Sequence, residues 1–230
     1  MMKSKNFDIN ELLSETGSSL LTIIYKSLLK RKKQIILECG VNKGYSTSIF
    51  SYYAENSDSY CFSIDINDCK DVVTSERWTF IHSDDSKVSE IIQDYPVLED
   101  KGIDILFIDS FHHVDHVKKL LYRWYPYLNK DSLIFIDDID ARSYRKGKEK
   151  DSYYNELNWE KINRFTRDFS ENNASDTTLT QYFGKTGLAK IVKKSNKGSL
   201  PNPIVNRNRS LLLQIIVLTI IKLKNLFRVK

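Results

Sequence analysis

The chain has 230 residues, of which 41% are hydrophobic and 28% are charged. This composition fits one globular domain with a buried core and excludes a low-complexity chain. The three cysteines match no zinc-binding spacing and indicate a reducing compartment. Because the N-terminal residues show no apolar signal segment, we expect a cytoplasmic protein.

The net charge of +5 is unevenly distributed along the chain. Residues 177–230 contain 11 Lys and Arg and no Asp or Glu, so residues 1–176 contain 24 basic and 30 acidic side chains. A basic C-terminal region favours an anionic partner, such as a membrane surface or a phosphorylated substrate, although it is equally compatible with a merely solvated tail. We expect no nucleic-acid partner.

Strands and helices alternate over the first two thirds of the chain. A helix with an apolar face is predicted within residues 20–28. Short apolar runs predict buried strands at 34–38, 60–65, 78–82, 103–109 and 132–138. Helix-length segments separate the strands, at 45–56, 86–94 and 114–128.

The pattern changes after residue 150. A helix is predicted at 154–169, followed by strands at 178–183 and 188–193 that a glycine-containing turn joins. The sequence therefore predicts an α/β fold with a doubly wound, Rossmann-like sheet. The sheet is mostly parallel, ends in an antiparallel hairpin, and has helices on both faces.

Acidic residues follow each of the five predicted parallel strands. The carboxyl ends of parallel strands meet at one edge of a sheet, where ligands bind. Five side chains are therefore expected at this edge: Glu38, Asp65, Asp84, Asp109 and Asp137.

The first of these acids begins the motif Glu38-x-Gly40-x-x-x-Gly44. The glycines allow a tight turn and close approach of a ligand to the backbone. Their spacing differs from that of nicotinamide dehydrogenases, and an acid here suits a cationic amino group such as that of methionine. The alternative is an ordinary strand–helix turn.

The next two acids have candidate roles in binding a nucleoside. Asp65 is placed to accept hydrogen bonds from ribose hydroxyls, or to serve as a cap or turn residue. Asp84 is placed to contact an adenine amino group, or to cap the helix that begins at Ser86.

Three carboxylates follow the fourth and fifth predicted strands: Asp109, Asp137 and Asp138. Together they form a site of hard oxygen ligands suited to Mg²⁺. His112 lies three residues beyond Asp109 and titrates near neutral pH, as a general base must. The alternative is that the acids cap helices and that His112 is a polar loop residue.

These motifs carry a resemblance to a known family. The segments Glu38-Cys39-Gly40-Val41-Asn42-Lys43-Gly44-Tyr45-Ser46, Phe107-Ile108-Asp109-Ser110-Phe111-His112 and Ile136-Asp137-Asp138 resemble class I S-adenosylmethionine-dependent methyltransferases. The likeness covers about residues 34–193 and is to the branch with macrocin-type sugar O-methyltransferases and cephalosporin hydroxylase-like proteins. The chain departs from that branch at Ser110, where Gly is usual, at Leu120, where Asp is frequent, and in the turn Asn129-Lys130-Asp131.

The resemblance implies a role for each motif residue. It implies that Asp109, Asp137 and Asp138 bind Mg²⁺ and that His112, with Asp109, is catalytic. It implies that Glu38 and Gly40 hold the methionine part of the cofactor and that Asp65 holds the ribose. The full set of expected cofactor-binding residues is Glu38, Gly40, Gly44, Ser46, Asp65, Asp84 and Asp109.

We accordingly divide the chain into four parts. An N-terminal helical segment (1–33) precedes a methyltransferase domain (34–194), a linker (195–209) and a basic tail helix (210–230). The apolar stretch within residues 211–221 is far shorter than the ~20 residues needed to span a bilayer. We expect the tail to contact a membrane surface peripherally, with packing against another subunit as the alternative.

The sequence thus predicts a Mg²⁺-dependent O-methyltransferase that uses S-adenosylmethionine. A sugar or other polyhydroxy acceptor is expected, with glycan or lipopolysaccharide assembly as one context and a homo-oligomer as one state. Residues 139–158 mix aromatic and basic side chains that are suited to cover such an acceptor, with a simple exposed loop as the alternative. Two alternatives are a metal-free O- or N-methyltransferase and a catalytically silent adenosine-binding or scaffold protein.

Overall fold

The computed structural model describes residues 19–204, 215–216 and 219. Residues 1–18 of the expected N-terminal segment and most of the expected tail helix lie outside this described part. Residues 215–216 and 219 are helical and exposed. No helix in the described ranges is long and apolar enough to cross a membrane.

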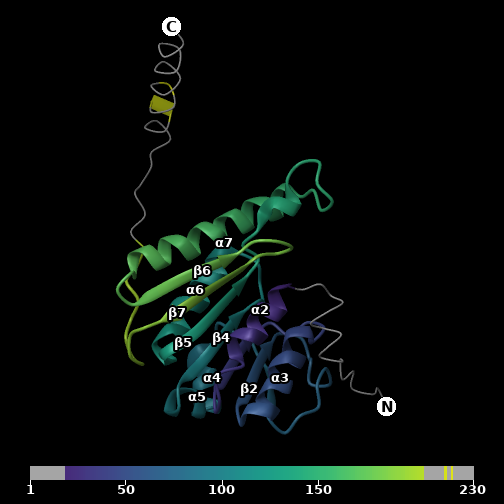
Figure 1. Ribbon diagram of the computed structural model, residues 1–230, viewed down its shortest axis with the longest axis vertical. Coiled ribbons are helices and arrows are strands. Elements are labelled where there is room, and N and C mark those ends of the chain that lie inside the picture. Colours follow the sequence, from purple (N-terminus) through teal and green to yellow (C-terminus); the bar gives the residue numbers. More distant parts are fainter. Residues whose placement is uncertain (1–18, 205–214, 217–218, 220–230) are drawn as a thin grey trace.

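A seven-stranded sheet forms the centre of the protein, in the order β3-β2-β1-β4-β5-β7-β6 (Figure 1). Its strands are β1 (Ile35–Cys39), β2 (Tyr60–Asp65), β3 (Trp78–His82), β4 (Ile103–Ile108), β5 (Leu128–Asp137), β6 (Thr177–Tyr182) and β7 (Leu188–Lys193). The first five strands are parallel, whereas β7 runs antiparallel to both β5 and β6. The predicted doubly wound sheet with a terminal antiparallel hairpin is confirmed.

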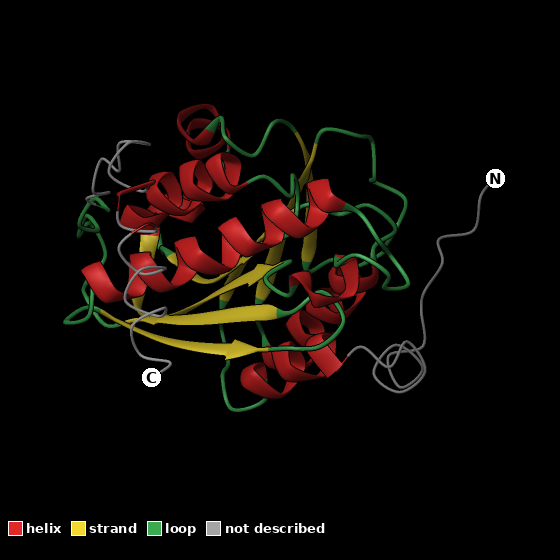
Figure 2. Ribbon diagram, turned by 90° about the horizontal axis from the view of Figure 1, so that it is seen from above, coloured by secondary structure: helices red, strands yellow, loops and turns green. Residues whose placement is uncertain are grey.

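Helices cover both faces of the sheet (Figure 2). They are α2 (Ser19–Leu28), α3 (Tyr45–Ser57), α4 (Val88–Asp94), α5 (Val97–Asp100), α6 (Val114–Trp124) and α7 (Tyr153–Asn172), with short 3₁₀ helices η1 (Tyr125–Tyr127) and η2 (Ala141–Tyr144). One hydrophobic cluster packs α2 and α3 against one face, and a larger cluster packs α4 to α7 against the other.

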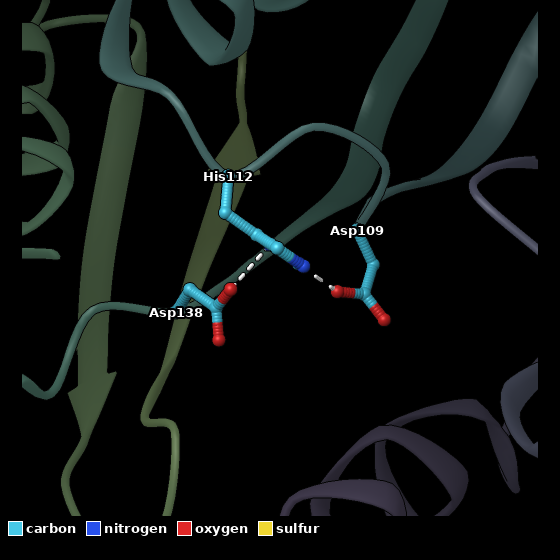
Figure 3. Close-up of side chains that lie close together, drawn as sticks. All are labelled: Asp109, His112 and Asp138. Atoms are coloured by element: carbon cyan, nitrogen blue, oxygen red, sulfur yellow. Dashed lines mark ion pairs between the residues drawn. The ribbon is translucent and has the colours of Figure 1, made fainter. Parts of the chain in front are cut away.

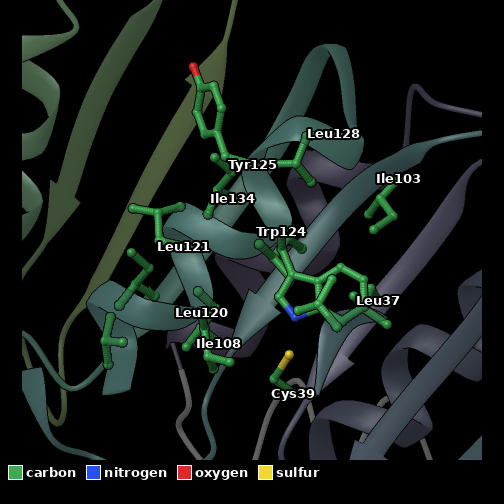
Figure 4. Close-up of a cluster of buried hydrophobic side chains, with 14 of the residues drawn as sticks. Leu37, Cys39, Ile103, Ile108, Leu120, Leu121, Trp124, Tyr125, Leu128 and Ile134 are labelled. Atoms are coloured by element: carbon green, nitrogen blue, oxygen red, sulfur yellow. The ribbon is translucent and has the colours of Figure 1, made fainter. Parts of the chain in front are cut away.

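Burial on both faces explains the near-continuous apolar runs of the central strands. All five residues of β1 are buried, as are five of the six in β4. Trp124 of α6 packs in the larger cluster over β1 and β4 (Figure 4). Its indole N–H donates to the carbonyl oxygen of Asp85 at 3.1 Å. This hydrogen bond ties α6 to the loop that follows β3.

The predicted helix over 114–128 ends earlier than expected, at Trp124. Tyr125 keeps α-helical dihedral angles, but Pro126 has no backbone N–H with which to continue the helical hydrogen bonds, and the chain forms η1 there instead. Strand β5 consequently begins at Leu128, which pairs with Ile103, before a register shift brings Leu133 opposite Ile105.

The direction in which the sheet is wound changes between β1 and β4. The chain runs outward from β1 through β2 to β3, and then returns to the other side of β1 to form β4 and β5. Such a switch opens a crevice at the carboxyl ends of the strands, where ligands bind in this class of fold.

Candidate active site

The loop after β1 lies directly against the end of β4. Gly40 has a positive φ of 98°, and a Cβ at this position would meet the carbonyl oxygen of Asp109 and come within 2.8 Å of the Ser110 Cα. Gly44, with φ 82°, begins α3, and a Cβ there would lie 2.9 Å from the Val72 side chain. The close approach of two backbones therefore requires glycine at position 40.

Glu38 is fully buried behind this loop. Its carboxylate accepts hydrogen bonds from three hydroxyls, those of Ser46 at 2.6 Å, Thr47 at 2.8 Å and Ser63 at 2.6 Å. Burial raises the pKa of Glu38 to about 7, although these hydrogen bonds act in the opposite direction. Glu38 thus joins β1, β2 and α3 from inside the protein and lines neither of the two cavities described below.

Asp65 fixes the same loop from the end of β2. One carboxylate oxygen accepts from the backbone N–H groups of Val41 at 2.9 Å and Asn42 at 3.1 Å, and the other from that of Asn67 at 2.8 Å. Burial alone would raise the pKa of Asp65, but these hydrogen bonds outweigh it and lower the pKa below its usual value. Asp65 is therefore held as a charged carboxylate at the edge of the crevice.

A cavity of about 520 Å³ opens beside this loop, within the size range of small-molecule sites. The expected residues Gly40, Asp65, Asp84, Asp109 and His112 all line it. Gly44 and Ser46 do not, although Ser46 lines a second cavity. Asp84 is exposed at the rim and accepts from the backbone N–H of Ser86 at 2.8 Å, so it also stabilises the turn before α4.

The second cavity, of about 190 Å³, lies on the other side of Asp109. Leu20, Leu21 and Ile24 of α2 line it together with Asp137 and Thr186. Asp109 lies in the wall of both cavities, which places this carboxylate where their contents meet.

An acid–histidine cluster stands at this junction (Figure 3). The Nδ1 atom of His112 contacts Asp138 Oδ2 and lies 4.0 Å from Asp109 Oδ1. Ligand-type atoms of all three side chains lie within 4.8 Å of one another. Asp138 has a left-handed φ of 63° and a side chain that is only 4% exposed, whereas His112 is half exposed. Asp137 lies beside them and accepts from the hydroxyl of Thr186 at 2.8 Å.

Crowding of carboxylates perturbs the pKa values in this cluster. Burial, and then the charges of Asp137 and Asp138, raise the pKa of Asp109 well above its usual value. Burial and the charge of Asp138 likewise raise the pKa of Asp137 to about 7. Burial acts to lower the pKa of His112, but its hydrogen bond to Asp138 and that carboxylate's charge raise it overall. The cluster therefore favours an added positive charge, as a proton or a metal ion.

The donor set fits a divalent cation with a preference for oxygen ligands. Ligand atoms of Asp109, His112 and Asp138 converge here, whereas Asp137 is not part of this group and bonds to Thr186 instead. In the described part of the chain, His112 is the only basic side chain that forms an ion pair with Asp109 or Asp138. Asp109, Asp137 and Asp138 match the hard-oxygen preference of Mg²⁺, and neighbouring His112 also suits softer divalent ions.

Two features of the site escaped the sequence reasoning. Thr186, in the β6–β7 turn, fixes Asp137, and only its place in a predicted turn drew attention to it. His116, which no sequence motif singles out, lines the larger cavity, 3.0 Å from Asp85 Oδ1 and 3.2 Å from the Ser110 hydroxyl. One carboxylate oxygen of the buried Asp85 has no hydrogen-bond partner.

The sheet order and the cavity at its switch point are those of the Rossmann-like methyltransferase fold. Comparison with family models agrees, because residues 37–139 match the model of a methyltransferase domain. The matched segment runs from β1 to just past the Asp137–Asp138 pair and so contains the motifs that indicate a methyltransferase. A comparison with curated proteins found no match.

Solved structures share the fold at low sequence identity. The MycE methyltransferase of the mycinamycin pathway, in complex with Mg and SAH, aligns with a TM-score of 0.58 and 18% identity, over 87% of this chain and 58% of that one. A Staphylococcus aureus protein described as a caffeoyl-CoA O-methyltransferase gives 0.60 and 18%, over 81% and 93%. CalS11, a TDP-rhamnose 3'-O-methyltransferase of calicheamicin biosynthesis, gives 0.51 and 18%, over 80% and 78%. The chain spans only 58% of the MycE length, and at these identities the likeness concerns the fold.

Proposed function

We propose that the protein is an O-methyltransferase that moves the methyl group of S-adenosylmethionine to a hydroxyl of a sugar or other polyhydroxy acceptor, with Mg²⁺ bound at the acid cluster. The observation that carries this proposal is the position of Asp109 and His112. Both line the larger cavity, Asp109 also lines the smaller one, and His112 contacts Asp138.

The larger cavity is the proposed cofactor site. The backbone at Gly40 leaves room for the methionine part, Asp65 accepts from the ribose hydroxyls, and Asp84 stands at the adenine end. Gly44 and Ser46 shape the loop and the start of α3. Glu38 then acts indirectly: its three hydrogen bonds fix that loop, and no direct contact with the methionine amino group is needed.

The smaller cavity is the proposed acceptor site, next to Asp109 and Asp137. Methyl transfer forms a bond from the acceptor oxygen to the methyl carbon and breaks the bond from that carbon to sulfur. His112, oriented by Asp138, takes the hydroxyl proton. Alignment of donor and acceptor in adjacent cavities accounts for the rest of the catalysis.

Asp109, Asp137 and Asp138 would hold the Mg²⁺ ion. When bound, the ion lowers the pKa of a coordinated hydroxyl and offsets the repulsion among these carboxylates. A neighbour of the same fold supports this part of the proposal, because MycE was solved with Mg and SAH. CalS11, described as a TDP-rhamnose 3'-O-methyltransferase, supports the sugar acceptor.

A second candidate function is metal-free O-methylation. The direct contact between His112 and Asp138 favours it, because an Asp–His pair forms a general base without a metal ion. Two further alternatives must be separated by experiment. They are an N-methyltransferase and a scaffold protein of the same fold without catalytic activity.

The deciding experiment combines binding and turnover. Calorimetry with S-adenosylhomocysteine, before and after addition of Mg²⁺, should show that the protein binds both. If Mg²⁺ does not bind and activity is unchanged in EDTA, the metal-free function is the correct one. A radiolabelled methyl-transfer screen over nucleotide sugars and glycan fragments should show turnover that His112→Ala abolishes. His113→Ala is the matched control, because that ring points to Asp115 and leaves the cluster intact.

The wider context of the protein stays a prediction. A cytoplasmic location, a homo-oligomeric state and the four-part division of the chain are expected from the sequence. Membrane contact through residues 211–230 concerns a segment that lies mostly outside the described residues.

A further inference from the structure

A basic pocket of about 410 Å³ lies between η2, α7 and the β6–β7 turn. Four arginines line it: Arg142, Arg145, Arg164 and Arg167. Only two acidic side chains, Asp140 and Glu160, line it with them. The pocket therefore concentrates positive charge in a part of the chain, residues 1–176, that is acidic as a whole.

Most of this positive charge is weakly neutralised. Arg142 pairs closely with Asp140, at 2.6 Å. Arg145 lies 3.9 Å from Glu156 and 3.8 Å from Glu160, and its side chain is 54% exposed. These longer separations are at the limit of an ion pair and leave the guanidinium hydrogen-bond donors available.

The two arginines on α7 complete the pocket. Arg164 lies 3.6 Å from Asp168 and is 59% exposed. Arg167 is exposed and forms no ion pair within the described part of the chain. They are three residues apart, so they project from one side of the helix into the same pocket.

The pocket adjoins the acid cluster through the chain itself. Ile139 and Asp140 line it and directly follow Asp138, and two peptide steps span at most about 7.6 Å between Cα atoms. Asp140 also accepts from the Gly184 backbone at 2.7 Å, and the Thr186 hydroxyl in the same turn donates to Asp137. One turn thus joins the wall of the pocket to the proposed acceptor site.

We propose that this pocket binds a phosphate or pyrophosphate group carried by the methyl acceptor. The planar guanidinium groups match phosphate oxygens, and Phe183, 55% exposed in the pocket wall, offers an apolar face beside them. The acceptor is then a sugar linked through pyrophosphate, to either a nucleoside or a lipid. This inference rests on the proposed function, because it names the class of substrate for the same site.

Binding of inorganic pyrophosphate to the full chain tests the pocket directly. Titration in EDTA, without Mg²⁺, keeps the probe from binding through a metal ion at the acid cluster. Arg164→Gln/Arg167→Gln should raise the Kd roughly 10- to 100-fold, because hydrogen bonds between charged groups are lost. The control Lys118→Gln/Lys161→Gln removes the same charge from exposed positions outside the pocket and should change the Kd less than about 2-fold. Equal binding by both double variants would overturn the inference, since the probe would then bind elsewhere, for example to the basic tail.

Turnover distinguishes the two sources of pyrophosphate. Methyl transfer is measured on one sugar in three forms: free, linked to uridine diphosphate, and linked to a short prenyl pyrophosphate. The arginine variant should raise KM for a pyrophosphate-linked form at least about 10-fold while kcat stays within about 2-fold. The preferred form identifies the source. A free sugar used as well as both linked forms would overturn the inference.

Failure of this inference and failure of the proposed function give different results. If S-adenosylhomocysteine binds and the free sugar is methylated, but pyrophosphate does not bind, the pocket assignment alone is wrong. If pyrophosphate binds through the arginines and no hydroxyl acceptor is methylated, the anion site stands and the proposed function is wrong.

Discussion

The two sides of the crevice treat their carboxylates in opposite ways. On the side of β1 and β2, Glu38 and Asp65 accept hydrogen bonds from neighbouring hydroxyl and backbone N–H groups. On the side of β4 and β5, Asp109, Asp137 and Asp138 crowd one another, and among the described residues the one charged partner of Asp109 is a histidine 4.0 Å away. The same residue type therefore stabilises structure on one side and destabilises it on the other.

This difference separates binding from chemistry. On the proposed cofactor side the loop is fixed in advance, so a ligand would meet a preorganised backbone and little ordering would be left to occur on binding. The acceptor side holds charge repulsion that a proton or a cation relieves, as is common at catalytic sites. Substitutions on the two sides should accordingly affect different measurements.

The largest expected effect comes from Asp138→Asn on the acceptor side. Loss of this carboxylate removes the partner of His112 and one proposed metal ligand. We expect kcat for methyl transfer to fall by about 10³-fold or more, while the Kd for S-adenosylhomocysteine changes less than about 3-fold. Steady-state kinetics and calorimetry on the same preparation measure the two effects.

Ser143→Ala, with a buried hydroxyl that has no hydrogen-bond partner, provides a control a few residues along the chain. It should retain normal turnover. Parallel losses of cofactor affinity and turnover in Asp138→Asn would show that the two sides are not separable.

Gly40→Ala should produce the next largest effect, this time on the cofactor side. The new Cβ would clash with the Asp109 carbonyl and approach the Ser110 Cα to 2.8 Å, in a backbone conformation that disfavours L-residues. We expect a loss of about 3 kcal/mol or more in the free energy of unfolding and much weaker S-adenosylhomocysteine binding. Urea denaturation and calorimetry measure these two quantities.

Gly198→Ala separates the clash from the backbone strain. Gly198 also has a positive φ, 86°, but has no atom within 4 Å of its would-be Cβ. This variant should lose only about 1 kcal/mol, the cost of the left-handed conformation. Equal losses in the two variants would mean that the close approach to β4 is unimportant.

Most of the fold was predictable because local patterns and global topology agree. The buried strands appear as mostly apolar runs, and an acidic residue lies near the crevice end of each, as Glu38 does in β1 and Asp109 does just after β4. The exception is the segment from Tyr125 to Asp131, where helical spacing continued to Leu128 but Pro126 ended the helix. There the missing backbone N–H of Pro126 outweighed the hydrophobic pattern.

The site was less predictable, because it depends on where side chains point. The motif placed Glu38 at the end of a strand, but sequence alone could not show that its carboxylate turns inward to three hydroxyls. The basic pocket was equally difficult to predict, because its arginines come from two separate segments of the chain. Arg142 of η2 and Arg164 of α7, for example, are 22 residues apart. Such arrangements arise only from tertiary packing.

Glu38 provides a pH-dependent test of the cofactor side. Its pKa rises from about 4.5 in the unfolded chain to about 7 in the folded protein, so between these values the folded state binds more protons. The contribution of Glu38 to stability is complete below pH 4.5 and falls by about 3 kcal/mol as the pH rises to 7. Asp137 produces a slope of the same sign, so the wild type must be compared with a variant.

Glu38→Gln is the appropriate variant, because it keeps the shape of the side chain without the titration. Its amide oxygen accepts from the hydroxyls on one side, and those on the other side must accept from its NH₂ group. Urea denaturation at several pH values measures the free energy of unfolding of the wild type and of the variant. The stability of the wild type relative to the variant should decrease from pH 4.5 to 7. A difference that is independent of pH would show that Glu38 is charged in the folded protein throughout this range.

The smallest expected effect is that of Asp65→Asn, and it tests whether the loop is fixed by charge or only by shape. Asparagine keeps one carbonyl oxygen, which still accepts from one set of backbone N–H groups, but the side-chain NH₂ would face the other set.

Because the pKa of Asp65 is lowered in the folded protein, its charge stabilises the fold above the unfolded pKa, and this contribution is lost as the pH falls through the folded value. We expect a loss of about 1 kcal/mol at neutral pH and a roughly 10-fold weaker affinity for S-adenosylhomocysteine, measured by calorimetry. Asp68→Asn, an exposed neighbour paired only with Lys70, should leave that affinity unchanged. If both variants bind equally well, the cofactor side is organised by the packing of Gly40 against β4, and its carboxylates contribute less than the hydrogen bonds suggest.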